Sequence, residues 1–223
     1  MKAEFISNRI ILLAVLASLI SLLNLNVQSS SGELINSSSL LPYNQSTGTT
    51  FPTINGTYRN SILGFKIDLP QGWKGIDLHN MAMVSPTGID TKTGGLLPGG
   101  DKVLMVLAGR NFSDFFKNLR DFKLSTFVNY LKSANVAMNC QIVSDKVVNF
   151  TGTKSVELVQ HCGLLGKVRI LSYIFASHDK LIFVSLKGTG VIFNHNLEVF
   201  KDSVQTIKIE RFQSSAMISK TNK

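Results

Sequence analysis

Between Val136 and Leu186, short runs of alternating or wholly apolar residues are separated by Gly, Asn and Asp, a pattern typical of an antiparallel β-meander. Its first hairpin is expected to turn around Thr151, and a second short turn is expected at residues 177–179. The rest of the domain is expected to pack on this meander. The predicted strands are Lys146–Phe150, Lys154–Gly163, Lys167–Ala176 and Lys180–Lys187.

The two cysteines of the chain lie at the open end of the first hairpin. A hairpin that folds about Thr151 places Cys140 opposite Cys162, within one residue of register. Directly paired residues of an antiparallel hairpin have the Cα separation that a disulfide needs. The sequence therefore predicts a cross-strand Cys140–Cys162 disulfide, which agrees with an oxidising compartment.

The two later strands of the meander, residues 168–176 and 181–186, are apolar on both faces, and such strands need cover on both sides. Helical spacing of apolar residues predicts elements that can provide this cover. We therefore expect an α+β fold, with an antiparallel meander sandwiched by helices on both faces in an α/β/α sandwich. The predicted helices are Ser113–Phe122, Ser125–Ala134 and Asn194–Val204, the last capped by Asn194, and the other predicted strands are Phe65–Leu69, Met81–Ser85, Val103–Ala108 and Thr206–Glu210.

The N-terminus has the layout of a secretory signal, because Lys2 and Arg9 precede the apolar segment Ile10–Leu23. Extended to Leu25, the apolar segment has 16 residues. As a helix it would be about 24 Å long at 1.5 Å per residue, which is shorter than the ~30 Å hydrocarbon core of a bilayer. Two outcomes stay open at this point: an uncleaved anchor and a signal cleaved after Ser29. Both place the domain outside the cytoplasm, at the cell membrane or secreted.

The chain divides into four parts by composition. Residues 1–29 form the signal or anchor, residues 30–57 a Ser/Thr/Asn-rich tether, residues 58–211 the folded domain and residues 212–223 a polar tail. The tether and the domain contain N-x-[ST] triplets, which are acceptors for N-glycosylation in an exported chain. The candidate acceptors are Asn36, Asn44, Asn55, Asn111 and Asn149.

The net charge of +9 comes from lysines and arginines scattered along the chain. Dispersed basicity favours solubility and weak attraction to anionic surfaces, whereas nucleic-acid binders concentrate it, so we expect no nucleic-acid partner. No histidine has a second metal ligand at helical spacing, and no G-x-S-x-G occurs. A bridged Cys162 cannot act as a nucleophile with His161 beside it. The sequence thus predicts no catalytic residue, no metal and no cofactor, and hence no enzyme.

A long Gly-rich loop, Pro86–Lys102, connects two predicted strands. It lacks the phosphate-loop pattern and leads into a strand, where that motif needs a helix. Asp90 and Asp101 are candidates to contribute oxygens to a cation near this loop, although solvated loop carboxylates are the simpler interpretation. The alternative hypothesis for the whole chain is a secreted carrier of a small ligand or metal ion, with this loop as its lid.

The segment Tyr58–Trp73, with its G-F-x-I-x-L-P-x-G-W core, resembles the opening strand of PsbP-like domains. These domains are relatives of the extrinsic P subunit of the oxygen-evolving complex and share the fold of a Ran-GTPase release factor. The order of later elements is also similar, up to an F-x-x-S-V helix at Phe200, Ser203 and Val204. Across roughly residues 58–210, the resemblance implies an α/β/α sandwich that binds or assembles with other proteins and is not an enzyme.

The leading hypothesis is therefore a non-enzymatic, extracytoplasmic PsbP-like module, held at the outer face of the membrane by a single N-terminal helix. Its expected partner is an envelope or membrane protein.

Overall fold

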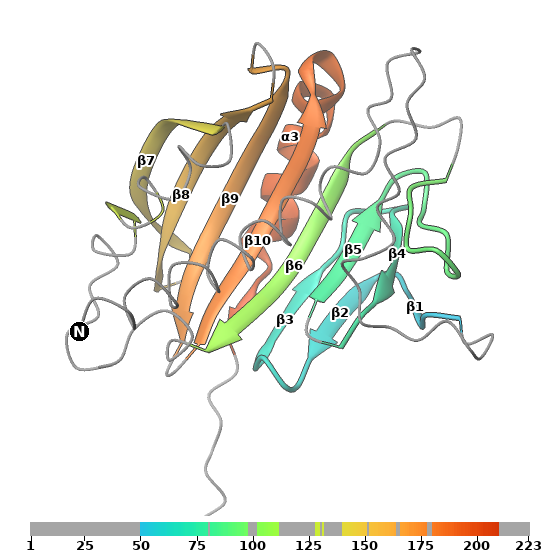
Figure 1. Ribbon diagram of the computed structural model, residues 1–223. Helices are drawn as coiled ribbons and strands as arrows, with labels where there is room; N and C mark the ends of the chain where they lie inside the picture. The colour runs from blue at the N-terminus through green and yellow to red at the C-terminus, as the bar shows by residue number, and fades with distance from the viewer. Residues whose placement is uncertain are drawn as a thin grey trace, which may run out of the picture.

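A computed structural model describes residues 50–79, 81–97, 102–111, 128–129, 131, 140–150, 152–163, 166–177 and 180–209. These residues form an eight-stranded antiparallel sheet of order β1-β4-β5-β6-β10-β9-β8-β7 and a smaller sheet of order β11-β3-β2 (Figure 1). One long helix, α3, crosses behind the large sheet in this view. The elements are β1 (Thr53–Ile54), β2 (Thr57–Asn60), β3 (Phe65–Asp68), β4 (Lys74–Asp77), β5 (Met81–Ser85), β6 (Leu104–Asn111), β7 (Cys140–Phe150), β8 (Thr153–Cys162), β9 (Val168–Ser177), β10 (Lys180–Thr189), α3 (Gly190–Gln205) and β11 (Lys208–Ile209).

The predicted α/β/α sandwich with helices on both faces is wrong. The described part of the chain is mostly antiparallel sheet, and α3 is the one helix that it contains in full. On the α3 side, the cover of the large sheet is shared between α3 and the small sheet β11-β3-β2, whose buried side chains join the same core. Strands buried on both faces require apolar cover, but a second sheet provides that cover as well as a helix does.

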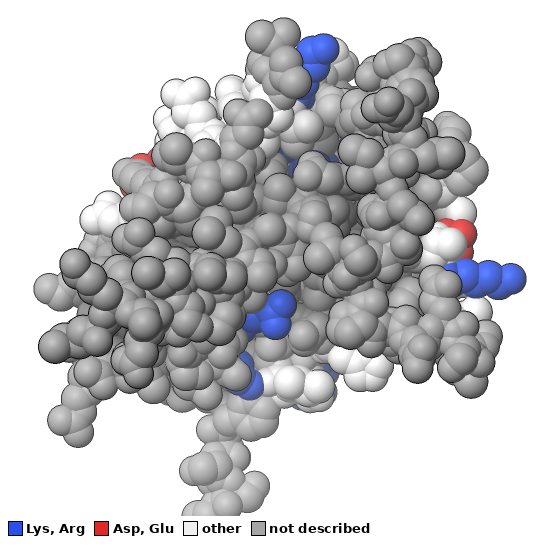
Figure 2. All heavy atoms as spheres, viewed as in Figure 1, with Lys and Arg blue, Asp and Glu red and all other residues white. Residues whose placement is uncertain are grey.

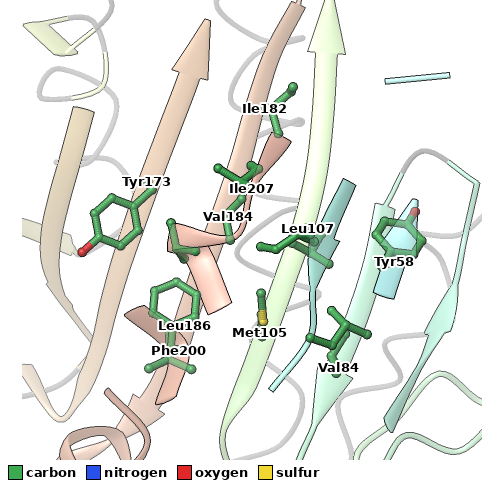
Figure 3. Packing of buried hydrophobic residues seen from close by; sticks show 14 of the residues in the cluster. Tyr58, Val84, Met105, Leu107, Tyr173, Ile182, Val184, Leu186, Phe200 and Ile207 are labelled. Atoms are coloured by element: carbon green, nitrogen blue, oxygen red, sulfur yellow. The ribbon is translucent and has the colours of Figure 1, made fainter. Parts of the chain in front are cut away.

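The centre of the large sheet is apolar on both faces, as the sequence predicted. On the α3 side, Leu186 of β10 and Met105 of β6 lie in one buried cluster with Phe200 of α3 (Figure 3). On the opposite side, Leu181 and Phe183 of β10 belong to a second buried cluster. The remaining buried members of that second cluster are Val128, Leu131, Val156, Leu158 and Ile174.

Helix α3 begins earlier than predicted and has a different cap. The chain passes from β10 into the helix at Gly190, and the N-cap residue is Thr189, whose side chain makes no capping hydrogen bond. The prediction of Asn194 as the cap is therefore wrong. Asn194 lies inside the helix, and its Oδ1 accepts a hydrogen bond from Arg169 Nη1 at 3.0 Å. The backbone of Gly190, with φ of 44°, allows the abrupt change from strand to helix.

The small sheet is attached to β4 through a buried polar network. Tyr58 Oη accepts a hydrogen bond from Asn60 Nδ2 at 2.8 Å and donates one to Asp77 Oδ1 at 3.2 Å. Asn60 Nδ2 also donates to the carbonyl oxygen of His79 at 2.8 Å. Burial raises the pKa of Tyr58 to about 12, so the phenol stays protonated and keeps its role as a donor.

Most strand predictions are confirmed. β5 has the predicted bounds, and the strands predicted from Phe65, Val103, Lys154, Lys167 and Lys180 occur within a few residues of their predicted bounds. β1, β2 and β4 were not predicted, and β1 lies before Tyr58, in the segment assigned to the tether. The helix predicted at Ser113–Phe122 and most of the helix predicted at Ser125–Ala134 lie outside the described residues. Trp73 is buried, as expected for a core residue.

Within the described ranges, no helix is both long enough and apolar enough to cross a membrane.

Lys187 is the unusual residue of the sheet interior. It lies on β10, between Ile170 of β9 and Leu104 of β6 in the register, and its side chain is half-buried. Burial disfavours the charged amine and lowers its pKa to about 8.

We predict that the free energy of unfolding rises between pH 8 and pH 10. Over this range the unfolded lysine still holds its proton, whereas the folded one has lost it, so the unfolded state binds more protons. At about 1.4 kcal/mol per pKa unit, this shift destabilises the folded protein below pH 8 by a few kcal/mol at most. Lys187→Met should therefore raise the stability at pH 7 and remove the rise, as measured by chemical denaturation across this pH range. Lys74→Met, at an exposed site on β4, is the control. If the stability of Lys187→Met and of wild type changed in parallel with pH, Lys187 would not be the cause of the rise.

Candidate protein-interaction edge

The longest open edge of the described strands is β7. It ends the order of the large sheet and pairs with β8 alone among the strands of that sheet. At 11 residues it is much longer than the other edge strands, since β1 and β11 have two residues each and β2 has four. An edge strand has one side that no other strand of its sheet pairs, so among the described strands β7 is the longest candidate for addition of a further strand.

Two valines are exposed on this edge strand. Val143 has 52% of its surface exposed and Val147 has 67%. Charged or polar side chains are usual on a long exposed edge, because they discourage pairing with other chains. On β7 the exposed Asp145 and Lys146 follow this rule, and Val143 and Val147 are the exceptions.

A bulge bends β7 near its start. Ile142 pairs with Gln160 and Ser144 pairs with Val159, so Val143 has no partner on β8. An extra residue of this kind increases the local twist and turns its side chain away from the regular alternation. The bulge therefore accounts for the exposure of Val143 and divides the edge, leaving residues 144–150 as its regular part.

A row of polar contacts ties the regular part of β7 to the sheet. Lys146 Nζ lies 3.0 Å from Glu157 Oε1, and Tyr173 Oη donates to Glu157 Oε2 at 2.8 Å. Burial, and then the hydrogen bond to Glu157, raise the pKa of Tyr173 well above its usual value. The Tyr173 ring stacks on Phe200 of α3 and meets Phe150 edge-on, with ring centroids 6.0 and 5.0 Å apart. The row thus holds β7, β8 and β9 in register and anchors them to the helix.

A shallow open groove runs beside β7, on the face opposite α3. Its volume is about 240 Å³. Val147 and Val156 supply apolar surface within it, and Asp145 and Lys146 add polar groups. The full lining is Val128, Asn129, Asp145, Lys146, Val147 and Val156. An apolar side chain of a strand added to β7 would have this groove beside it.

The predicted disulfide is confirmed. Cys140 and Cys162 are directly paired in the register, and their sulfur atoms are bonded at 1.99 Å. The bond fixes the start of β7 to the end of β8, just before the bulge. Because Cys162 is bridged, it is not a nucleophile for His161.

The structure places some of the candidate glycosylation sites and not others. Asn55 and Asn149 are exposed, and Asn149 lies near the end of β7. Asn111 is the last residue of β6. Asn36 and Asn44 lie outside the described residues, and glycosylation at all five sites stays a prediction.

One of the two candidate ligands of the Pro86–Lys102 loop lies in the described part of the chain, and a shared cation site stays a prediction. Asp101 lies outside the described residues. Asp90 Oδ1 accepts hydrogen bonds from the backbone nitrogens of Lys92 at 2.7 Å and Thr93 at 3.3 Å. These bonds lower the pKa of Asp90, and they use its oxygen to shape the loop. No cluster of three or more metal-ligating side chains occurs among the described residues.

The described part of this loop packs on the sheet. Ile89 forms a bridge with Leu96 and is buried in a cluster that includes Ile76 of β4 and Met83 of β5. The lid of the carrier hypothesis gains no support from this packing and stays a prediction.

The sequence did not identify the β7 edge. Residues 140–145 were not assigned to a strand, and the position of a strand within a sheet is not encoded in its own alternation. The available signal was the stretch Val147-Val148, beside Asp145 and Lys146, in which apolar and charged residues do not alternate as they do on a half-buried strand.

Comparison with known proteins finds similar structures but no similar sequences. No protein-family model matches the chain, and no curated protein matches its sequence. The solution structure of cyanobacterial PsbP (CyanoP) from Synechocystis sp. PCC 6803 has a TM-score of 0.50 and 16% identity, and the match covers 74% of this chain and 95% of that one. At this identity the likeness establishes the fold alone.

Two further solved structures are similar at lower scores. A Pseudomonas aeruginosa protein of unknown function has a TM-score of 0.45 and 15% identity, with 70% of this chain and 96% of that chain covered. The Ran-binding protein Mog1p of Saccharomyces cerevisiae has a TM-score of 0.43 and 8% identity, with 71% and 96% covered.

We predict that removing the disulfide destabilises the domain by about 3 kcal/mol, because the bond closes a loop with a sequence separation of 22 residues and restricts the unfolded chain. The paired variant Cys140→Ser with Cys162→Ser tests this in urea denaturation. Wild type under reducing conditions is the matched comparison, and an unchanged denaturation midpoint in the paired variant would contradict the prediction.

Proposed function

We propose that this chain, whose PsbP-like fold confirms the resemblance found in its sequence, is a non-enzymatic binding or assembly module that acts outside the cytoplasm. In this proposal, its N-terminal segment holds it at the outer face of the membrane, and a partner protein adds a strand to β7. The observation that carries the proposal is the long exposed edge of β7, with its two exposed valines.

The geometry supports strand addition over other modes of binding. Backbone hydrogen bonds along β7 supply affinity in this mode, and pockets for alternate side chains supply specificity. β7 offers both, because the groove at Val147 lies beside the open edge. The contacts among Lys146, Glu157 and Tyr173 hold the strand in place before a partner arrives, which lowers the entropic cost of binding.

A placement outside the cytoplasm is supported by sequence and covalent structure together. The basic start and apolar segment at Ile10–Leu23 are typical of an export signal. The Cys140–Cys162 disulfide is typical of proteins that fold in an oxidising compartment. The proposed partner is accordingly an envelope or membrane protein.

We predict that Val143→Lys combined with Val147→Lys removes partner binding. Lysine on an edge strand opposes pairing with a further strand, and both sites are exposed, so the fold should be little changed. The measurement is crosslinking in the native membranes, followed by capture of the chain and quantitative mass spectrometry. Partner recovery should fall at least about tenfold, the effect of losing roughly 1.4 kcal/mol of binding free energy.

Val199→Lys is the matched control, because Val199 is 44% exposed on α3, away from the edge. It should leave partner recovery unchanged. Equal recovery from the edge variant and the control would show that β7 is not the binding site.

We also predict that the intact, non-reduced protein from its own membranes has the mass of residues 1–223 less two hydrogens, because the apolar segment stays attached and the disulfide is formed. Mass spectrometry of the detergent-extracted protein measures this directly. A mass that begins near Ser30 would show cleavage and would favour the secreted alternative.

A further inference from the structure

A second surface lies at the opposite end of β10 from Lys180, where β10 passes into α3. We name it the α3 tip and define it by His161, Lys167, Arg169, Val191, Asn194 and His195. Figure 1 shows the start of α3 at the upper end of the sheet, beyond the end of β10. The α3 tip is thus a projecting end of the molecule, and it shares no residue with the β7 edge.

The register and one hydrogen bond bring the residues of the α3 tip together. His161 of β8 is directly paired with Arg169 of β9, and Arg169 is directly paired with Gly188 of β10. Arg169 Nη1 then donates to Asn194 Oδ1 on α3 at 3.0 Å. Strands β8 and β9, Lys167 just before β9, and the helix therefore contribute to one surface.

The charge of this surface is mainly positive. Lys167 is exposed and Arg169 is half-buried, and neither residues 161–169 nor residues 187–197 contain Asp or Glu. The next acidic residue on α3, Glu198, pairs with Lys201 at 2.8 Å. The first turn of α3 also lacks an acidic residue, so the partial positive charge of the helix start adds to that of the side chains. On the face seen in Figure 2, a lysine or arginine lies at the upper end, and acidic side chains come into view only toward the left and right edges.

An exposed apolar side chain stands within this basic surface. Val191, in the first turn of α3, has 84% of its surface exposed, the largest value among the exposed large apolar residues described. Asn194 and His195 beside it are also exposed. An exposed apolar residue on the same end of the domain as two cations is the chemistry of a protein surface that rests on anionic lipid headgroups.

We propose that the α3 tip contacts an anionic membrane surface, with Lys167 and Arg169 on lipid headgroup phosphates and Val191 inserted between the headgroups. The inference rests on the membrane attachment in the proposed function, because the contact is weak without it. Each lysine or arginine near an anionic surface strengthens binding by roughly fivefold, so two cations and one valine give only transient binding. Attachment to the same membrane raises the effective concentration of the module at the surface to roughly the millimolar range, which makes such a contact lasting.

The proposed contact also orients the module. With the α3 tip toward the membrane, the long axis of β10 points away from the bilayer, and the β7 edge runs along the side of the domain (Figure 1). The edge is then open to a partner that stands beside the module on the same membrane.

The test uses the full chain carrying Val191→Cys, labelled with an environment-sensitive fluorophore. Both native cysteines are bonded to each other, so the label reacts only with the new thiol. The labelled chain is reconstituted in nanodiscs of phosphatidylcholine alone or with added phosphatidylglycerol. The label should shift to the blue and brighten in the discs that contain phosphatidylglycerol, and the change should disappear when Lys167→Glu and Arg169→Gln are added.

Ile62→Cys is the matched control. Ile62 is apolar and 58% exposed, and its carbonyl accepts a hydrogen bond from Lys180 at the start of β10, so it marks the other end of the sheet. Its label should give the same emission in both kinds of disc.

Three results would overturn the proposal. The first is equal emission from the label at position 191 in the two kinds of disc. The second is an unchanged response to phosphatidylglycerol in the Lys167→Glu and Arg169→Gln variant. The third is a response of the label to soluble polyglutamate but not to lipid, which would make the α3 tip a site for an acidic protein. Failure of the proposed strand addition is seen separately, because the Val143→Lys and Val147→Lys variant keeps the α3 tip intact.

Discussion

The pairing of β9 with β10 is the interaction on which the rest of the structure depends. It runs without a break from Lys180–Ser177 to Thr189–Val168, and the side chains of β10 are buried alternately on the two faces of the sheet. Every other strand of the large sheet is added on one side or the other of this pair. The end of β10 continues directly into α3, so the position of the helix follows from the position of this strand.

The sequence predicted those parts of the fold in which a strand pairs with the next strand along the chain. In the meander each strand pairs with its neighbour in the chain, so the turn at Thr151 was enough to predict the Cys140–Cys162 register and the disulfide. The small sheet was not predictable in this way. The alternation of Phe65 and Ile67 identified β3, but one of its two partners, β11, comes from the far end of the domain. Alternation contains no information about a distant partner.

The start of α3 and the strand β4 were not predicted correctly, because contacts with distant residues determine both. The helix was expected to start at Asn194, a good cap by residue type, but its start is fixed by the turn at Gly190 and by the packing of Phe193 against Gly188. The strand β4 was missed because Gly75 weakens its pattern. A Cβ at Gly75 would lie 1.9 Å from the carbonyl oxygen of Met83, so the glycine is required by close contact with β5. The β7 edge was not predicted for a different reason, because the exposure of Val147 depends on which strand ends the sheet.

The junction between α3 and the small sheet has a consequence for the order of events in the cell. Ser203 donates a hydrogen bond to the carbonyl oxygen of Asp68, and the Asp68 nitrogen donates to Thr206 Oγ1 across a separation of 138 residues. Ile209 then pairs with Phe65. Until residues 203–209 have been synthesised, the hairpin of β2 and β3 has no strand on its open side and no helix beneath it. The small sheet therefore closes only after nearly the whole domain has been synthesised, and contacts of such long sequence separation slow folding.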